Sequence, residues 1–300
     1  MQISTAIETV NLTDELYGNK QVSVSVARLD KLHPIISGNK YFKLKYNIKD
    51  ALAAGKKGIV TFGGAYSNHL AATAFACKEA GLQAVAVVRG EASPQLSYTL
   101  IFCKEMGMVI EFVSRAEYGN KEKLYHHYQN KYPDHYLVPE GGDNEAGEKG
   151  CAEILSYIED SNQYSHIVCD IGTGTTFKGI VKNSSLKQTV IGIVVLKGAE
   201  AMEKTLAEEL APHKNFQLIH DYHFGGYAKK TDELIDFMNQ FYQQHQLPTD
   251  FVYTAKQFYA VNDLIVKNFF PSGSKILCLH TGGLQGNLSL PPETLIFNFF

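Results

Sequence analysis

Residues 58–88 read GIVTFGGAYSNHLAATAFACKEAGLQAVAVV. A short apolar run ends in two glycines, a helical pattern follows from His69 to Ala80, and a second apolar run covers residues 84–88. Strands that alternate with helices pair in parallel through right-handed crossovers. Both runs are continuously apolar, which is typical of parallel strands buried on both faces. This stretch therefore predicts an α/β fold.

The same alternation continues along most of the chain. Further strands are predicted at residues 108–113, 136–138, 166–171, 190–196 and 275–279, and helices at residues 95–106, 116–131 and 144–158. Residues 21–27 differ, because valine alternates there with polar residues. Such alternation favours an edge strand with one face in water. The predicted fold class is α/β, with open, mostly parallel sheets covered by helices.

Length and composition narrow the class of protein. Three hundred residues can bury about three-quarters of the unfolded chain's surface, which suits one two-lobed enzyme or two modest domains. The net charge is −3 and no basic stripe is present, so nucleic acid is not expected as a partner. No apolar stretch approaches the roughly 18 residues that span a membrane, and residues 1–4 carry no secretory signal. A cytoplasmic protein is expected.

The cysteines point to the same compartment. There are five, they are widely spaced, and none forms a CxxC pair: Cys77, Cys103, Cys151, Cys169 and Cys278. An odd, scattered set favours neither a zinc site nor a disulfide framework, so no metal is expected. Free thiols are typical of a reducing compartment.

Three loops follow predicted strands, and ligands of open α/β sheets bind beyond the carboxyl ends of strands. The first loop covers residues 63–69 and reads GGAYSNH. Its glycines permit close approach of the backbone to a ligand. Ser67 and Asn68 stand at a predicted helix N-terminus, which favours anions. The alternative is simple N-capping by either side chain.

The second loop covers residues 172–176 and reads GTGTT. Small residues, open N–H groups and hydroxyls at a helix start favour a phosphate site, although a tight turn explains the same residues. Phe177 replaces the last glycine of a nucleotide fingerprint, and the Walker lysine is absent. The third loop, residues 280–283, reads HTGG and offers a hydroxyl that can donate to a ring nitrogen.

Lys40 lies in residues 37–44, which read SGNKYFKL. It follows a turn-prone segment and opens a stretch with a helical pattern. A lysine that is fixed and partly desolvated in this way can lose its proton and form a Schiff base. The alternative is an ordinary surface lysine at a helix start.

Taken together, these motifs resemble the pyridoxal-phosphate (PLP) enzymes of fold type II, the tryptophan synthase β-subunit family. The nearest branch holds 1-aminocyclopropane-1-carboxylate (ACC) deaminase and D-cysteine desulfhydrase. The matching segments occur in the family's order: residues 32–34 with 37–40, 63–69, 139–142 with Gly147 and Gly150, 172–176, 250–254 and 280–283. The resemblance implies a two-lobed enzyme with a small domain at 47–155 and a large domain formed by 1–46 and 156–300. PLP would lie in the cleft between them.

The resemblance also implies roles for individual residues. Lys40 would carry the cofactor and move protons at the substrate Cα. Ser67, Tyr227 and Tyr253 would be the other catalytic residues. The cofactor would further contact Asn68, Gly172, Thr173, Gly174, Thr175, Thr176, Thr254 and Thr281, and the substrate would contact Ser67, Asn68 and His69. Thr281 would meet the pyridine nitrogen, and a neutral hydroxyl would leave that nitrogen unprotonated.

The chain departs from the family pattern at several positions. Phe42 replaces an arginine, Phe251 and Ala255 flank the Val-Tyr-Thr motif in place of proline and glycine, and Ala228 replaces a glycine after Tyr227. These changes are expected to affect the choice of substrate more than the binding of the cofactor.

The predicted reaction is α,β-elimination from a small amino acid, D-cysteine or a β-substituted alanine, to pyruvate and ammonia. ACC deaminases of the family carry Glu and Leu where this chain has Thr254 and Thr281, and the two threonines are similar to the desulfhydrase pattern. ACC deaminase and a serine or threonine dehydratase are the alternative enzymes. A phosphate-ligand-binding α/β protein is the alternative without catalysis. The family also implies a homodimer.

Overall fold

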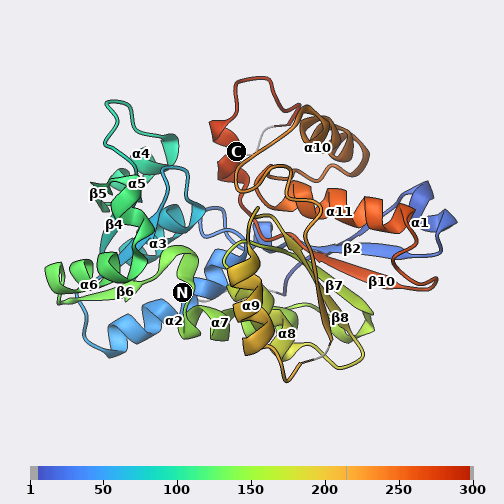
Figure 1. Cartoon of the computed structure of the whole chain (residues 1–300), viewed down its shortest axis with the longest axis horizontal. Helices are drawn as coiled ribbons and strands as arrows, with labels where there is room; N and C mark the ends of the chain where they lie inside the picture. Colours follow the sequence, from blue (N-terminus) through green and yellow to red (C-terminus); the bar gives the residue numbers. More distant parts are fainter. Residues whose placement is uncertain (1–5, 214, 298–300) are drawn as a thin grey trace. The chain divides into compact units, whose positions relative to one another are not determined.

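The computed structural model describes residues 6–213 and 215–297. They form two compact units (Figure 1). The first unit consists of His33–Ile36 and Lys40–Gly150. The second unit consists of Ser37–Asn39 and the described residues in 6–32 and 151–297. The long continuous segment of the first unit thus runs from Lys40 to Gly150, and the domain division predicted at residues 47 and 155 stays a prediction.

The first unit is built on a four-stranded parallel sheet with the strand order β5-β4-β3-β6. Its strands are β3 (Gly58–Gly63), β4 (Gln83–Arg89), β5 (Val109–Val113) and β6 (His135–Val138). Its helices are α2 (Asn39–Ala53, shared with the second unit at Asn39), α3 (Asn68–Glu79), α4 (Tyr98–Glu105), α5 (Arg115–Gly119), α6 (Lys121–Lys131), the short 3₁₀ helix η2 (Glu140–Gly142) and α7 (Glu145–Ala152, which ends in the second unit).

Helices cover both faces of this sheet. Alternate side chains of β3 and β4, such as Phe62 and Val87, pack with Tyr118 of α5 and Tyr128 of α6. Alternate residues of a strand point to opposite faces. Accordingly, Thr61 points away from that cluster and contacts α3. The continuous apolar runs therefore form buried parallel strands, as predicted.

The second unit is built on a six-stranded sheet with the strand order β1-β2-β10-β7-β8-β9, in which only the β1–β2 pair is antiparallel. Its strands are β1 (Thr9–Leu12), β2 (Ser23–Ala27), β7 (His166–Ile171), β8 (Thr189–Val194), β9 (Phe216–Ile219) and β10 (Lys275–Leu279). Its helices are α1 (Glu15–Asn19), α8 (Thr175–Asn183), α9 (Glu200–Glu209), α10 (Asp232–His245) and α11 (Thr254–Val266), with the 3₁₀ helices η1 (Leu29–Lys31), η3 (Ile154–Tyr157), η4 (Ser161–Gln163) and η5 (Leu284–Ser289).

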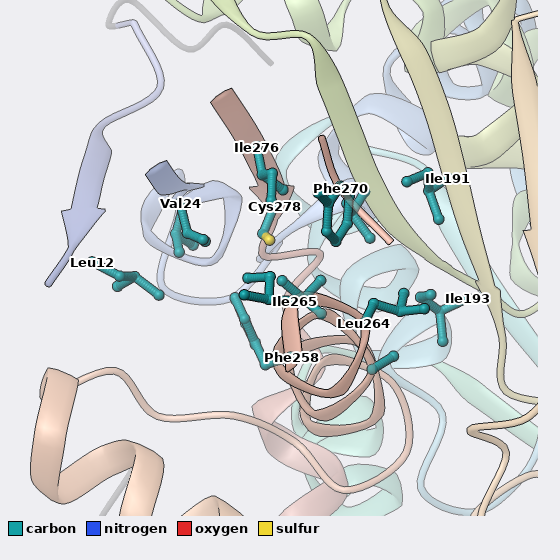
Figure 2. Close-up of a cluster of buried hydrophobic side chains, with 14 of the residues drawn as sticks. Leu12, Val24, Ile191, Ile193, Phe258, Leu264, Ile265, Phe270, Ile276 and Cys278 are labelled. Carbon is teal, nitrogen blue, oxygen red and sulfur yellow. The ribbon is translucent and has the colours of Figure 1, made fainter. Parts of the chain in front are cut away.

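A hydrophobic cluster lies between one face of this sheet and α11. Figure 2 shows Leu264 of α11 beside Ile193 of β8, and the same cluster includes Val24 of β2 and Cys278 of β10. On the opposite face, a Cβ added at Gly192 of β8 would lie 2.9 Å from the Phe177 ring of α8. Helices α8 and α11 thus hold β7 and β8 between them. This places the loop that joins β7 to α8 at the carboxyl edge of the sheet.

One predicted strand has a different place in the sheet. Residues 21–27 were expected to form an edge strand with a wet face, but β2 is paired on both sides, with β1 and β10. On its polar face, Ser25 is buried and donates a hydrogen bond to its cross-strand partner Asn11 of β1 at 2.7 Å, while Ser23 is exposed. The edge-strand prediction is therefore wrong.

One predicted helix is divided in two, and another ends earlier than its periodicity indicates. The helix expected at 116–131 is two helices divided at Asn120, which ends α5 and caps α6 by accepting from the Lys123 N–H at 3.1 Å. The helix expected at 144–158 ends at Ala152 and is followed by η3. Strands β1 and β9 and helices α9, α10 and α11 lie where no element was predicted.

All five cysteines are buried and free. Burial raises the pKa of the Cys77 and Cys103 thiols to about 12 and raises those of Cys169 and Cys278 further. Within residues 6–213 and 215–297, no helix is long and apolar enough to cross a membrane, and no group of three His, Cys, Asp or Glu could hold a metal ion.

Candidate active site

The first loop of the sequence analysis joins β3 to α3 in the first unit. Ser67 is the N-cap of α3, and its hydroxyl accepts from the Leu70 N–H, so the capping role occurs as the simpler alternative expected. The next residue, Asn68, has a buried Oδ1 atom without a hydrogen-bond partner among the described residues. An unsatisfied buried oxygen is costly unless a ligand or water completes it. The loop therefore has a polar group left to bind a ligand.

His69 on α3 is a buried, neutral ring with one lone pair that has no partner among the described residues. Thr61 donates its only hydroxyl proton to the Val138 carbonyl at 2.9 Å, so it accepts from His69 Nε2 at 2.8 Å. Burial, and then the charges of Lys40 and Lys43, hold the pKa of His69 well below its ordinary value of 6.5. Nδ1 is buried and has no partner in the described chain. The contact of His69 with the substrate stays a prediction. In such a contact, Nδ1 of the neutral ring can only accept a hydrogen bond.

Lys40 is the second residue of α2 and is half-buried. Two residues later Phe42 is fully buried and packs edge-on against Tyr41, with ring centroids 5.4 Å apart. A Cβ on Gly150 would lie 1.8 Å from the Phe42 carbonyl oxygen, so α7 lies directly against this turn of α2. A charge at position 42 would be desolvated there, so the loss of the family arginine matches an apolar core position.

In the second unit, the GTGTT loop leads from β7 into α8 as predicted. Gly174 adopts φ +87°, the left-handed region that favours glycine, and the helix has no side-chain cap. The first N–H groups of a helix point out of its end without partners in the helix. The Thr173 and Thr175 hydroxyls lie 2.9 Å apart at this end. The geometry suits a bound phosphate.

The residues just before Lys40 are hydrogen-bonded within the second unit to the start of α8 and to the loop after β10. Asn39 Nδ2 donates to Thr176 Oγ1 at 3.0 Å, and the Asn39 N–H donates to the Thr281 carbonyl at 3.1 Å. Gly38 adopts φ +68°, and a Cβ there would lie 1.8 Å from the Thr281 carbonyl oxygen. Only glycine permits this approach.

Tyr253, the N-cap of α11, lies over the phosphate loop. A Cβ on Gly172 would be 3.1 Å from its Cε1 atom. Its ring meets that of Tyr227 at a centroid distance of 6.0 Å, so the structure brings the two predicted tyrosines together. Burial first, and then Tyr227, raise the pKa of Tyr253 well above its ordinary value of 10. Tyr253 is therefore a protonated phenol at neutral pH, while Tyr227 is 47% exposed.

The Thr254 hydroxyl makes its hydrogen bonds within its own turn, with Asp250. Its hydroxyl donates to Asp250 Oδ1 and accepts from the Asp250 N–H, each at 2.8 Å, and the side chain is fully buried. Asp250 Oδ2 in turn accepts from the Tyr253 N–H at 3.0 Å. Thr254 thus fixes the residue that precedes it, and its direct contact with the cofactor stays a prediction.

Thr281 follows β10, and its hydroxyl donates to Asp170 Oδ1 at 2.5 Å. Asp170 lies on β7, the strand that pairs with β10. No role was predicted for Asp170. A carboxylate inside an apolar strand and next to a glycine-rich loop is nevertheless unusual, and it could have indicated a functional residue.

Lys256 is a second residue without a predicted role. It is fully buried, and its Nζ donates to the carbonyls of His223 at 2.9 Å and Gly226 at 2.8 Å. These carbonyls belong to the turn that precedes Tyr227. Lys256 therefore stabilises the turn that precedes Tyr227. The sequence did not indicate this role, because it shows only a single lysine on a helix.

We expect Lys256 to make the free energy of unfolding increase with pH. Burial lowers its pKa from 10.5 to about 8, although Asp250 partly offsets this. Between these values the unfolded chain binds a proton that the folded chain has released, so stability rises with pH, by up to about 3 kcal/mol. Below about pH 8 both states are protonated and the contribution is constant.

The measurement is urea unfolding at pH 7 to 10.5 for the wild type and Lys256→Met. Other titrating groups cancel in the difference between the two proteins. The wild type should gain stability over the variant as the pH rises, and parallel curves would contradict the assignment.

The residues present fit PLP. The second unit supplies a loop whose geometry suits an anion, with a phenol over it. The first unit supplies a half-buried lysine and two buried polar atoms without partners among the described residues, Asn68 Oδ1 and His69 Nδ1. The matched motifs thus supply the donor types that this cofactor needs: a lysine, a phosphate loop and polar partners for the ring.

Comparison with known proteins agrees with this chemistry. The model of the family described as "Pyridoxal-phosphate dependent enzyme" matches residues 5–282. A Pyrococcus abyssi protein provisionally named 1-aminocyclopropane-1-carboxylate deaminase is 31% identical, over 91% of this chain and 88% of that protein. The D-cysteine desulfhydrase of Serratia proteamaculans is 26% identical, over 97% and 94%. The solved structure of an ACC deaminase homologue superposes with a TM-score of 0.82 at 29% identity, over 96% of this chain and 92% of that one. The chain therefore belongs to the family of pyridoxal-phosphate-dependent enzymes.

Proposed function

We propose that Lys40 and the loop 172–176 hold the same molecule of PLP. This proposal rests on the two hydrogen bonds that Asn39 donates, one to Thr176 Oγ1 and one to the Thr281 carbonyl. Lys40 follows Asn39 by one peptide bond, so its Cα lies about 3.8 Å from the Asn39 Cα. The residue that precedes the lysine is thereby tied to the start of the phosphate-loop helix.

Bound PLP supplies an electron sink for negative charge at the substrate Cα. The N–H groups at the start of α8 would hold its phosphate, and the Asn68 side chain would bind its phenolic oxygen. Ser67 and the N–H groups of its loop would bind the substrate carboxylate, and His69 would contact the substrate through Nδ1 as a hydrogen-bond acceptor. Lys40 takes the proton from Cα.

We further propose that the reaction is α,β-elimination from D-cysteine or a β-substituted alanine. For D-cysteine, water is consumed and pyruvate, ammonia and hydrogen sulfide are released. Tyr253 supports this, because its protonated phenol can donate a hydrogen bond to the sulfur, where negative charge develops as the Cβ–S bond breaks. The likeness to a D-cysteine desulfhydrase and the two threonines, Thr254 and Thr281, support the same choice.

ACC deaminase is the second candidate, because relatives of similar identity carry that name. A serine or threonine dehydratase is the third, and it rests on the fold alone. Membership in an enzyme family argues against a phosphate-binding protein without catalysis.

A panel of amino acids tests the reaction. We expect the PLP-loaded protein to release sulfide and pyruvate from D-cysteine, and to act weakly on ACC, measured as 2-oxobutyrate, and on L- and D-serine, measured as pyruvate. Efficient turnover of ACC without sulfide release from D-cysteine would show that the choice between the two reactions is wrong. The homodimer and the cytoplasmic location stay predictions, and light scattering of the purified protein tests the first.

A further inference from the structure

The hydroxyl of Thr281 commits its only proton to a buried carboxylate. Thr281 Oγ1 donates to Asp170 Oδ1 at 2.5 Å, and the two residues are 6% and 5% exposed. A distance of about 2.5–2.7 Å is that of a strong O–H···O⁻ hydrogen bond to a charged acceptor. Because the pair is shielded from water, solvent does not compete for this proton.

This bond fixes what Thr281 can offer to a ligand. A threonine hydroxyl has one proton and two lone pairs, and an ionised carboxylate only accepts. Once the proton points to Asp170, the outward side of Thr281 Oγ1 presents lone pairs alone. A ring nitrogen that meets this oxygen forms a hydrogen bond only if the nitrogen carries its own proton.

We propose that Asp170 is a positioning residue that makes Thr281 a hydrogen-bond acceptor, so that the pyridine nitrogen of bound PLP is held protonated. The inference rests on the proposed contact between Thr281 and the cofactor ring. It reverses the sequence expectation that a neutral hydroxyl leaves this nitrogen unprotonated.

Cys169 and Tyr253 are titratable neighbours of Asp170. Burial raises the pKa of both, and Asp170 raises both further, so these two neighbours stay neutral at physiological pH. Of these three groups, Asp170 is thus the one that can place a negative charge beside Thr281. A charge at this place stabilises a protonated ring through the hydroxyl, and a protonated ring withdraws electrons from the substrate Cα more strongly.

The ¹⁵N resonance of the pyridine nitrogen tests the proposal directly, because it separates a pyridinium from a neutral pyridine without reference to turnover. The wild type, Asp170→Asn, Thr281→Ser and Thr281→Val are loaded with PLP labelled at that nitrogen and measured from pH 6 to 9. We expect a pyridinium in the wild type and in Thr281→Ser, which keeps the hydroxyl.

In Asp170→Asn the amide can donate to Thr281 Oγ1 and turn its proton towards the ring, so the resonance should move to the neutral range. Thr281→Val should move it in the same direction, and it decides the question even if Asp170→Asn does not fold. A neutral nitrogen in the wild type, or a pyridinium that survives both substitutions, would overturn the role of Asp170.

Borohydride reduction of the same samples separates this result from a failure of the proposed function. A pyridoxyl label on Lys40 together with a neutral nitrogen would refute the role of Asp170 alone. A label on another lysine would refute the proposed placement of the cofactor.

Discussion

Lys40→Ala is expected to reduce turnover of every substrate by about 10³-fold or more. The substitution removes both the covalent anchor of the cofactor and the base at the substrate Cα, and a positioned base alone contributes about 10²–10⁴-fold. The loop 172–176 is unchanged, so some PLP should still bind without a covalent bond. Initial rates of pyruvate release, compared with those of the wild type, measure the loss.

Lys49→Ala is the matched control, because Lys49 lies on the same helix and is exposed. It should keep full activity and a pyridoxyl label on Lys40 after borohydride reduction and peptide mapping. If Lys40→Ala retained the label at another lysine and most of its activity, the assignment of Lys40 would fail.

Gly38→Ala is expected to destabilise the protein by about 3 kcal/mol and to weaken PLP binding. An alanine in the left-handed region costs about 1–2 kcal/mol, and forcing atoms into a packed site costs about 1–3 kcal/mol more. The new Cβ would lie 1.8 Å from a backbone oxygen of Thr281, which cannot move aside like a flexible side chain. Its displacement would shift the Asn39 anchor and the cofactor site together.

Gly55→Ala separates the two contributions. Gly55 has a similar φ of +61°, but a Cβ there would meet no atom within 4 Å. It should show only the backbone cost in urea unfolding and should leave PLP affinity unchanged. Equal losses of stability in the two variants would show that the approach of Gly38 to Thr281 has no energetic importance.

The sequence predicted the parallel strands well because they are continuous apolar runs, such as β3 and β7. It failed at β2, because alternation shows only that one face is polar and not whether that face meets water. Ser25 is buried because Asn11, fourteen residues earlier, supplies its partner. Such pairing depends on which strands become neighbours, which no local pattern records.

The residues of the candidate site also fall into two groups, those that the sequence indicated and those that only the structure showed. Motifs of contiguous residues identified Lys40, Ser67 and the loop 172–176, because each is local to one turn or helix start. The role of Asp170 arises from its contact with Thr281, 111 residues away along the chain, and that of Lys256 from its contact with Gly226, 30 residues away. A one-dimensional pattern shows an isolated charge at these positions, and only the pairing of β7 with β10 and the packing of α11 give that charge a partner.

The burial of the five thiols has a consequence for the proposed release of sulfide. Sulfur nucleophiles cleave disulfides to form persulfides, and redox modification of cysteine follows thiolate character and exposure. All five cysteines are buried, none forms a disulfide, and the raised pKa values of four keep them protonated. Sulfide released by the proposed elimination therefore meets no disulfide to cleave and no exposed thiol on this protein.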